Sequence, residues 1–315
     1  MGVLRVDNSR LTSVATCDTQ AVLQYVHGYQ ARDEPAPRMG GKIGHESLAY
    51  YFDNAGDAEG ALKVFWDNYK PFSDRHQVED GDMPQWGFRN MYDVLKHYYM
   101  MHPIERFPFN PVEQSAEVPV IAKLTDGVEF WAKLDLLGRE KVTGALYPID
   151  HKFRGAGITH WWLRQFVRGS QLTGYMWAAM QQTGEVVPGA YLNAIDMKKL
   201  PDLRYKKDGT PYKCNKHSTL VTECRMLHSE HQLKIVTRTP QAIEDWKVEA
   251  IGFAQRFERL VRTFPEIDTI EYAGVQGTFN GGCTFCQFKD FCNAGRKPEL
   301  IDSMLIHAPW EPWNQ

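Results

Sequence analysis

The sequence lacks a long apolar run, a strong charge of one sign and any internal repeat. No segment of its 315 residues is apolar over the length that a bilayer-spanning helix needs, so we expect no membrane partner. The formal net charge of −3 supplies no overall basic field, so a chain of this kind that binds nucleic acid does so through a local groove. The 43% hydrophobic content is that of a folded protein, and with no evident linker we expect residues 1–315 to form a single domain.

Cysteine is scarce, and a secretory signal is missing. The first residues, Met1 to Asp7, lack the charged-then-apolar pattern of a signal peptide, so we expect a cytoplasmic protein, in the host cytoplasm if a phage encodes it. In that reducing compartment the six cysteines are expected to be metal ligands or buried thiols rather than disulfides.

Hydrophobic periodicity predicts helices around a central run of strands. Strands are expected over residues 117–124, 129–137, 146–152 and 190–197, the first two joined by a turn at 125–127. Helices are expected over about residues 9–29, from 45 through 51, and over 60–69, 85–101, 161–182 and 240–263. The tail from residue 274 onward is expected to be a loop. This order of elements implies an α/β or α+β core.

Two carboxylates and a lysine fall on neighbouring predicted strands. Asp150 and Lys152 are two residues apart, so in a strand their side chains point to the same face. If the two strands are neighbours, Asp135 lies across from Asp150. Two carboxylates beside a carbonyl form a hard oxygen site suited to Mg²⁺ or Mn²⁺, which activates a bound water and stabilises charge on a phosphate. An Asp-x-Lys pair alone is more often part of a solvated strand face. Other motifs in the sequence are therefore needed to assign it a catalytic role.

Further motifs accompany this pair in a fixed order. His45 follows a glycine-rich turn at a helix start, and Gln171 and Tyr175 share one helix face by their i,i+4 spacing. The four segments are Gly41-Lys42-Ile43-Gly44-His45, Ala132-Lys133-Leu134-Asp135, Asp150-His151-Lys152 and Gln171 to Tyr175. In this order they resemble the RecB-like branch of the PD-(D/E)XK nuclease superfamily. Ala132 departs from the family's usual glycine by a small change in volume.

The resemblance implies a nuclease core, a mixed central sheet flanked by helices, with residues 113–197 as its catalytic part. It implies that Lys152 activates or steers the attacking water and that Gln171 and Tyr175 position substrate or catalytic groups. It also implies that Glu117 corresponds to a glutamate that relatives often carry on an earlier strand. The implied metal ligands are His45, Asp135, Asp150 and the carbonyl of His151. An imidazole beside carboxylates suits Mn²⁺ somewhat better than Mg²⁺.

Three cysteines lie close together near the C-terminal end. Cys283, Cys286 and Cys292 form a C-x2-C-x5-C array, and thiolates packed this closely point to a shared metal or cluster. Cys17 is the candidate for a fourth ligand. A structural zinc site and unliganded thiols are the alternatives. The layout resembles the iron–sulfur subgroup of RecB-like nucleases, which includes AddB-type and CRISPR-associated nucleases. It implies a [4Fe–4S] cluster that joins residues 11–30 to 274–295 as a structural staple.

Two other groups have open interpretations. Cys214, His217, Cys224 and His228 have an almost finger-like spacing, but a hairpin with incidental cysteines is the favoured interpretation, and we leave them out of the metal ligands. Residues 198–216 are locally basic and carry two tyrosines, which fits either a path for a phosphate backbone or a solvated surface. The basic residues are Lys198, Lys199, Arg204, Lys206, Lys207, Lys213 and Lys216. Trp161, Trp162, Arg164 and Arg168 form a second possible contact region.

Together these features predict a metal-dependent DNA nuclease. From the resemblance we expect an exonuclease that acts on single-stranded DNA or DNA ends in recombination, repair or related processing, with a helicase or recombination protein as a possible partner. One alternative is a non-catalytic DNA-end-binding subunit with a structural iron–sulfur cluster. An iron–sulfur redox protein is a third, but it leaves the Asp-x-Lys strand and the Gln-x-x-x-Tyr helix unexplained.

Overall fold

The computed structural model describes residues 3–32, 35–201, 205–216, 218–224, 228–284 and 286–309. Arg204 and His217, which entered the sequence predictions, lie outside these ranges. Among the described helices, none combines the length and the apolar character needed to cross a membrane.

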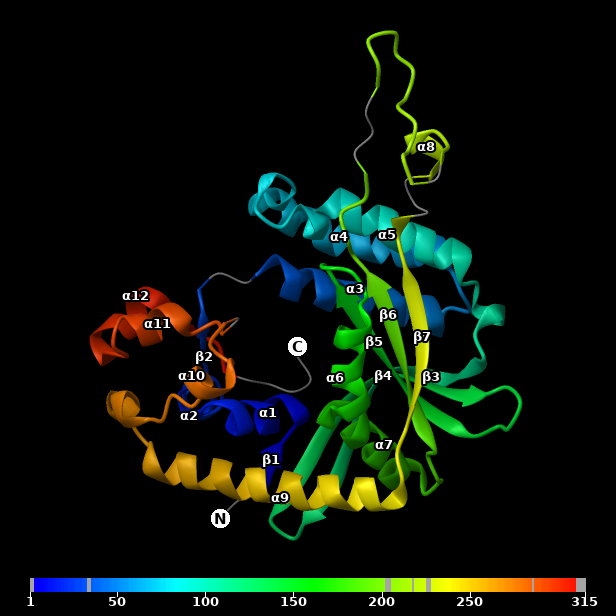
Figure 1. The fold of residues 1–315 in the computed structure, drawn as a ribbon. Coiled ribbons are helices and arrows are strands. Elements are labelled where there is room, and N and C mark those ends of the chain that lie inside the picture. Colours follow the sequence, from blue (N-terminus) through cyan, green and yellow to red (C-terminus); the bar gives the residue numbers. More distant parts are fainter. Residues whose placement is uncertain are drawn as a thin grey trace.

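A six-stranded mixed sheet forms the centre of the fold (Figure 1). Its strands are β1 (Leu4–Val6), β3 (Phe109–Thr125), β4 (Val128–Glu140), β5 (Leu146–Arg154), β6 (Gly189–Asp196) and β7 (His231–Thr237). The order is β1-β4-β5-β6-β7, and β3 also pairs with β4. A tight turn makes β3 and β4 antiparallel, whereas a long connection through two helices lets β5 and β6 run parallel. The predicted mixed sheet flanked by helices is confirmed.

Helices cover both faces of this sheet. One face carries α3 (Ala36–Asp53), α4 (Ala58–Arg75) and α5 (Phe88–Met101), and the other carries α1 (Asn8–Thr16), α6 (His160–Arg168), α7 (Ser170–Thr183) and α9 (Pro240–Thr263). The first core is aromatic and includes Tyr51, Phe65 and Tyr98, and the second includes Phe130 and Trp246. Every residue of β6 is buried, as expected for a strand covered on both faces.

Short elements from both ends of the chain lie side by side (Figure 1). They are α2 (Asp18–Ala21), the π-helical turn Val22–Val26, β2 (Tyr29–Ala31), α10 (Gly277–Asn280), α11 (Lys289–Asn293), α12 (Ile301–Met304) and β8 (Leu305–His307), with 3₁₀ turns at Ile267–Tyr272 and Pro298–Leu300. β2 and β8 pair in antiparallel orientation. The structure therefore brings residues 11–30 and 274–295 together.

Four element predictions are wrong in detail. The helix expected over 9–29 is interrupted at Cys17, whose backbone is extended (φ −163°, ψ 123°), because the backbone N–H of Thr19 donates to Gly274 instead of to its own helix. The helix expected over 161–182 is two helices that meet at Gly169. The glycines before His45 lie inside α3, not in a turn, since that helix begins at Ala36. The tail also forms short helices rather than only loop.

A long excursion separates β6 from β7. These strands pair directly, with Ile195 opposite His231, yet the chain between them leaves the sheet and projects past α4 and α5 (Figure 1). It contains one short helix, α8 (Val221–Cys224), and two isolated bridges, Tyr205 to Pro211 and Lys213 to Leu220.

Candidate active site

The two predicted carboxylates meet where β4 and β5 run side by side. The register pairs Leu136 with Ile149, so the next position along brings Asp135 opposite Asp150. The backbone N–H of His151 donates to Asp135 Oδ2 at 2.8 Å, and Lys152 Nζ donates to Asp150 Oδ1 at 2.7 Å. Asp150 is fully buried. The strands thus supply two buried carboxylates and one cation at a single point.

His45 reaches this point from helix α3. Its Nδ1 lies 3.2 Å from Asp135 Oδ2. The approach depends on Gly44, since a Cβ placed there would lie 2.6 Å from the ring of Phe153 on β5. The glycine before the histidine therefore allows the helix to pack tightly onto the strand.

Glu117 completes the acidic group from β3. The pairing of β3 with β4 shifts between Pro111 and Ala116, and Glu117 directly after this irregularity has a positive φ of 55°. Such a φ is strained for a glutamate, and bulges commonly redirect side chains near functional sites. Ligand atoms of Glu117, His45 and Asp135 all lie within 4.8 Å of one another. Glu117 also forms an ion pair with Lys133.

Burial and neighbouring charges shift the pKa values in opposite directions. Burial raises the pKa of Asp150 to about 6, with Lys152 opposing and Asp135 adding to the rise. Burial alone would raise the pKa of Asp135 as well, but His45 and Lys152 hold it well below its usual range. For His45 and Lys152, burial instead opposes protonation, yet the carboxylates outweigh it and raise the pKa of both.

The ring of His151 lies on the face of the sheet opposite to the side chains of Asp150 and Lys152, its neighbours in β5. Its Nδ1 lies 2.8 Å from Asn193 Nδ2, which also donates to Tyr98, so Nδ1 accepts and the proton sits on Nε2. The ring stacks on Phe52, and burial lowers the pKa of His151 to about 3, which keeps it neutral. Only the backbone of His151 therefore faces the carboxylates. Asn193 is not among the predicted site residues, although a polar residue within an otherwise apolar strand was a usable signal.

Gln171 and Tyr175 form a linked pair on α7. Gln171 Nε2 donates to the Tyr175 hydroxyl at 3.0 Å. Burial, followed by the charges of Asp135 and Asp150, raises the pKa of Tyr175 well above its usual value. The phenol therefore stays protonated near the carboxylates.

The donor set fits a divalent cation. Asp150 Oδ2 is buried and has no hydrogen-bond partner among the described residues, an arrangement that costs free energy unless a cation or a water satisfies it. Carboxylate oxygens with one imidazole match the preferences of Mg²⁺ and especially Mn²⁺.

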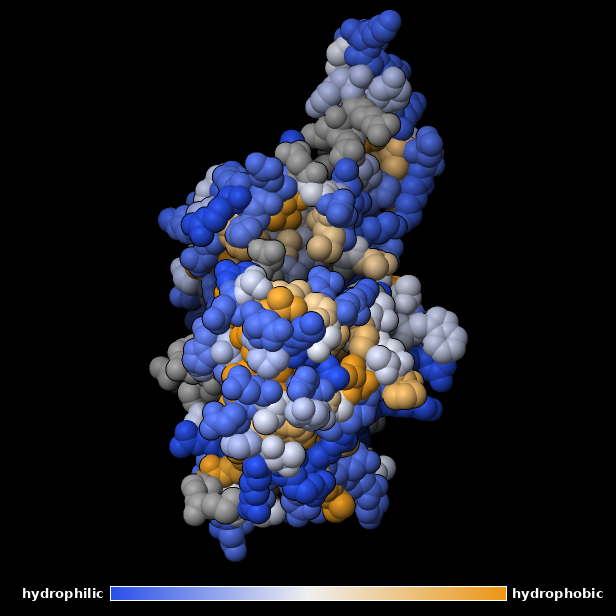
Figure 2. All heavy atoms as spheres, turned by 90° about the vertical axis from the view of Figure 1, so that its left-hand side faces the viewer, coloured by the Kyte–Doolittle hydropathy of each residue, from blue (hydrophilic) through white to orange (hydrophobic). Residues whose placement is uncertain are grey.

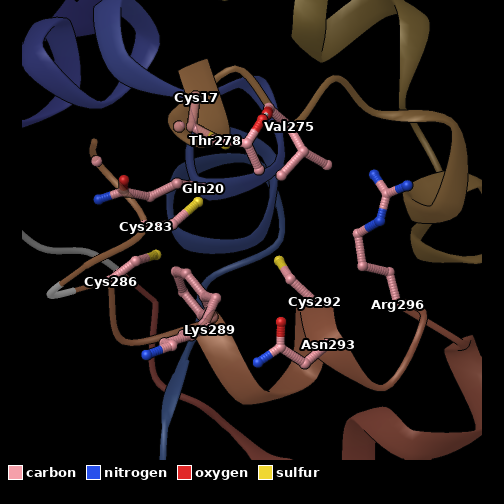
Figure 3. A pocket seen from close by; sticks show the side chains of 13 residues that line it. Cys17, Gln20, Val275, Thr278, Cys283, Cys286, Lys289, Cys292, Asn293 and Arg296 are labelled. Atoms are coloured by element: carbon pink, nitrogen blue, oxygen red, sulfur yellow. The ribbon is translucent and has the colours of Figure 1, made fainter. Parts of the chain in front are cut away.

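The four predicted cluster cysteines line one cavity of about 350 Å³. Cys17 comes from the break between α1 and α2, and Figure 3 shows the thiols of Cys283, Cys286 and Cys292 pointing into a common space. Burial, then the neighbouring thiols, raise the pKa of Cys292 to about 11. Among the described residues, no three of these four sulphur atoms all lie within 4.8 Å of one another.

The two predicted DNA-contact regions lie on different elements, one on the excursion between β6 and β7 and the other on α6. Lys206, Lys207 and Lys213 are exposed on the excursion, which projects past α4 and α5 (Figure 1). Trp161 on α6 is 77% exposed with the Arg164 guanidinium 5.3 Å from its ring.

Comparison with known proteins assigns the family. The sequence model of the PD-(D/E)XK nuclease superfamily matches residues 8–293, which include both carboxylate strands and all six cysteines. The chain belongs to this superfamily. No curated protein matches it. Fifteen solved chains do, among them a candidate exonuclease from Eubacterium rectale that is 14% identical, with a TM-score of 0.49 over 91% of this chain and 87% of that one. The predicted superfamily is therefore confirmed, and the iron–sulfur subgroup stays a prediction.

Proposed function

We propose that the protein is a metal-dependent DNA nuclease that hydrolyses phosphodiester bonds as an exonuclease, at single strands or DNA ends. The observation that carries this proposal is the convergence of Asp135, Asp150 and Lys152 at one buried point, where one oxygen of Asp150 has no partner in the part of the chain that the structure describes. A site that only bound DNA ends would have no need for a buried carboxylate left unsatisfied. Membership of the nuclease superfamily supports the same conclusion.

The acidic residues and His45 are the proposed ligands of the metal ion. Asp135 and Asp150, with His45 and Glu117 beside them, would hold Mn²⁺ or Mg²⁺, and the His151 carbonyl is the further proposed ligand. When bound, such an ion supplies Lewis acidity toward a phosphate and a more acidic water. Burial of the site keeps bulk water from weakening these charges.

Lys152 acts as a cation in this scheme. Its pKa is raised by Asp150 and Asp135 against the effect of burial, which favours the protonated amine. It holds Asp150 in place and can stabilise negative charge on the attacking water or the phosphate. Tyr175, protonated and bonded to Gln171, can donate a hydrogen bond to substrate on the same face.

The four cysteines are proposed to hold a [4Fe–4S] cluster. A single tetrahedral zinc ion would draw its thiolates to about 3.8 Å from one another. The sulphur atoms here are spread more widely around a cavity of about 350 Å³, which favours a multi-iron cluster. The exposed lysines of the excursion are a proposed path for the DNA backbone.

The test is a nuclease assay on anaerobically purified protein with Mn²⁺, using end-labelled linear DNA and circular single-stranded DNA. We expect the wild type to degrade linear DNA and spare circles, and Lys152→Ala to lose on the order of 10²-fold or more of this activity while binding DNA normally. Lys123→Ala, whose amine pairs with Asp126 on an exposed hairpin, is the matched control and should keep full activity. Equal activity of wild type and Lys152→Ala would reject the assigned site. Cleavage of circles would reject the exonuclease.

A further inference from the structure

The excursion between β6 and β7 is too poorly packed to fold by apolar burial alone. Its only buried hydrophobic cluster among the described residues consists of Cys214, Val221 and Cys224. Its tyrosines, Tyr205 and Tyr212, are 55% and 49% exposed. Segments with so small a core are usually held by a disulfide or a structural metal.

The backbone of the excursion is nevertheless ordered around these cysteines. The N–H of Cys214 donates to Thr219 at 2.7 Å, and that of Ser218 donates back to the carbonyl of Cys214 at 2.8 Å. The N–H of Val221 donates to Tyr212 at 2.8 Å, which ties α8 to the preceding turn. The two cysteines therefore come from a tight knuckle and a one-turn helix that face each other, an arrangement that brings both thiols to one point.

One imidazole nitrogen meets both thiols. His228 Nε2 lies 3.2 Å from Cys214 Sγ and 3.8 Å from Cys224 Sγ, and all three ligand atoms lie within 4.8 Å of one another. Tetrahedral zinc with bonds of about 2.3 Å to sulphur and about 2.0 Å to nitrogen places such atoms about 3.6 Å apart. A hydrogen bond explains one sulphur beside the nitrogen, since Nε2 can accept a proton from only one thiol. It does not explain two.

We propose that Cys214, Cys224 and His228 form a structural zinc site that folds the excursion into a projecting, basic finger. Two thiolates and an imidazole are the donors that zinc prefers in structural sites. Figure 2 shows hydrophilic side chains over the tip of this projection, which carries the exposed Lys206 and Lys207. The site is independent of the cavity lined by Cys17 and of the nuclease assignment, because it shares no residue with either.

Metal analysis of the full-length protein separates the two centres. After anaerobic purification, we expect one equivalent of zinc together with the iron of the cluster. Cys224→Ser and His228→Gln should lose the zinc and keep the iron, Cys286→Ser should do the reverse, and Lys207→Ser should keep both. Any of three results would overturn the proposal. Cys224→Ser could retain its zinc, or Cys286→Ser could lose its zinc. The wild type could also lack zinc and carry a disulfide between Cys214 and Cys224.

Protease cleavage of the wild type tests the same proposal without any variant that could misfold. Trypsin cleavage within the excursion, after Lys206, Lys207 or Lys213, is expected to become on the order of tenfold faster when zinc is chelated, since the open form is then no longer suppressed by binding. Added Zn²⁺ should restore protection, and Mg²⁺ should not. Cleavage at the same rate with and without zinc would reject a structural role.

Discussion

Asp7 is a half-buried carboxylate that lies away from the acidic site, near the N-terminal end of the chain. Its carboxylate caps α1 by accepting the backbone N–H of Arg10 at 2.7 Å, and α1 leads directly to Cys17. Burial, opposed by Arg10, raises the pKa of Asp7 to about 6. The cap is therefore strained electrostatically at neutral pH, where the carboxylate is ionised.

Asp7→Asn should stabilise the protein relative to wild type as pH rises. The folded pKa of Asp7 is higher than its ordinary value of 3.8, so its protonation contributes stability that is present at low pH and lost as pH rises through about 6. Asparagine is an equally good cap and does not ionise. Between pH 5 and pH 7 the free energy of unfolding of wild type should fall by about 1 kcal/mol relative to Asp7→Asn, measured by urea denaturation. Parallel pH profiles for the two proteins would contradict the shift.

Glu117 stores backbone strain beside the acidic site. At a φ of 55°, glycine costs less than a residue with a Cβ. Glu117→Gly should therefore be about 1 kcal/mol more stable than Glu117→Gln, because both lose the ion pair to Lys133 and only the glycine relieves the strain. Both variants should lose nuclease activity with Mn²⁺. Thermal unfolding and the end-labelled assay measure the two effects, and a glycine variant no more stable than the glutamine variant would show that the strain is absent.

At the scale of elements, local patterns predicted most of the fold, and tertiary contacts account for the errors. Helix α9 has its predicted bounds, Pro240–Thr263, and Thr239 caps it, because an amphipathic repeat with an N-cap is encoded locally. The break at Cys17 is not local, since partners more than 250 residues away supply its hydrogen bonds. For the same reason the sequence could align Asp135 with Asp150 only on the assumption that their strands are neighbours. The bulge before Glu117 carried no signal in the sequence.

The packing of α3 on β5 gives an element-scale prediction. Gly44→Val should push the helix away from Phe153, displace His45 from Asp135, and lower nuclease activity by roughly tenfold or more at a stability cost of about 1–3 kcal/mol. Gly41→Ala is the matched control, because no described residue outside its own stretch of helix comes within 4 Å of the added Cβ. It should leave activity intact and stabilise the helix by up to about 1 kcal/mol. Normal activity in Gly44→Val would mean that His45 is not needed at its present position.

At the scale of the whole molecule, non-covalent contacts join the two ends of the chain. Besides the β2–β8 pairing, Arg256 forms an ion pair with Asp18 at 2.8 Å, and Asn280 Nδ2 donates to the carbonyl of Thr16 at 2.9 Å. Each such bond contributes little by itself, and the two segments also share a buried apolar core that includes Val22 and Phe291. Closing so long a loop costs entropy that a covalent cluster can offset.

Cys286→Ser should therefore release the cap formed by residues 11–30 and 274–295 while the sheet stays folded. We expect a colourless protein, faster amide hydrogen exchange in both segments, and unchanged exchange in the buried strand β6. The wild type and Lys289→Ala, which alters the same cavity without removing a thiol, should stay brown and protected. If both segments exchange slowly in Cys286→Ser, the non-covalent contacts alone hold the ends together and the cluster is not a staple. If β6 also exchanges faster, the cap and the catalytic sheet unfold as one unit, and any loss of nuclease activity in the variant then follows from global destabilisation.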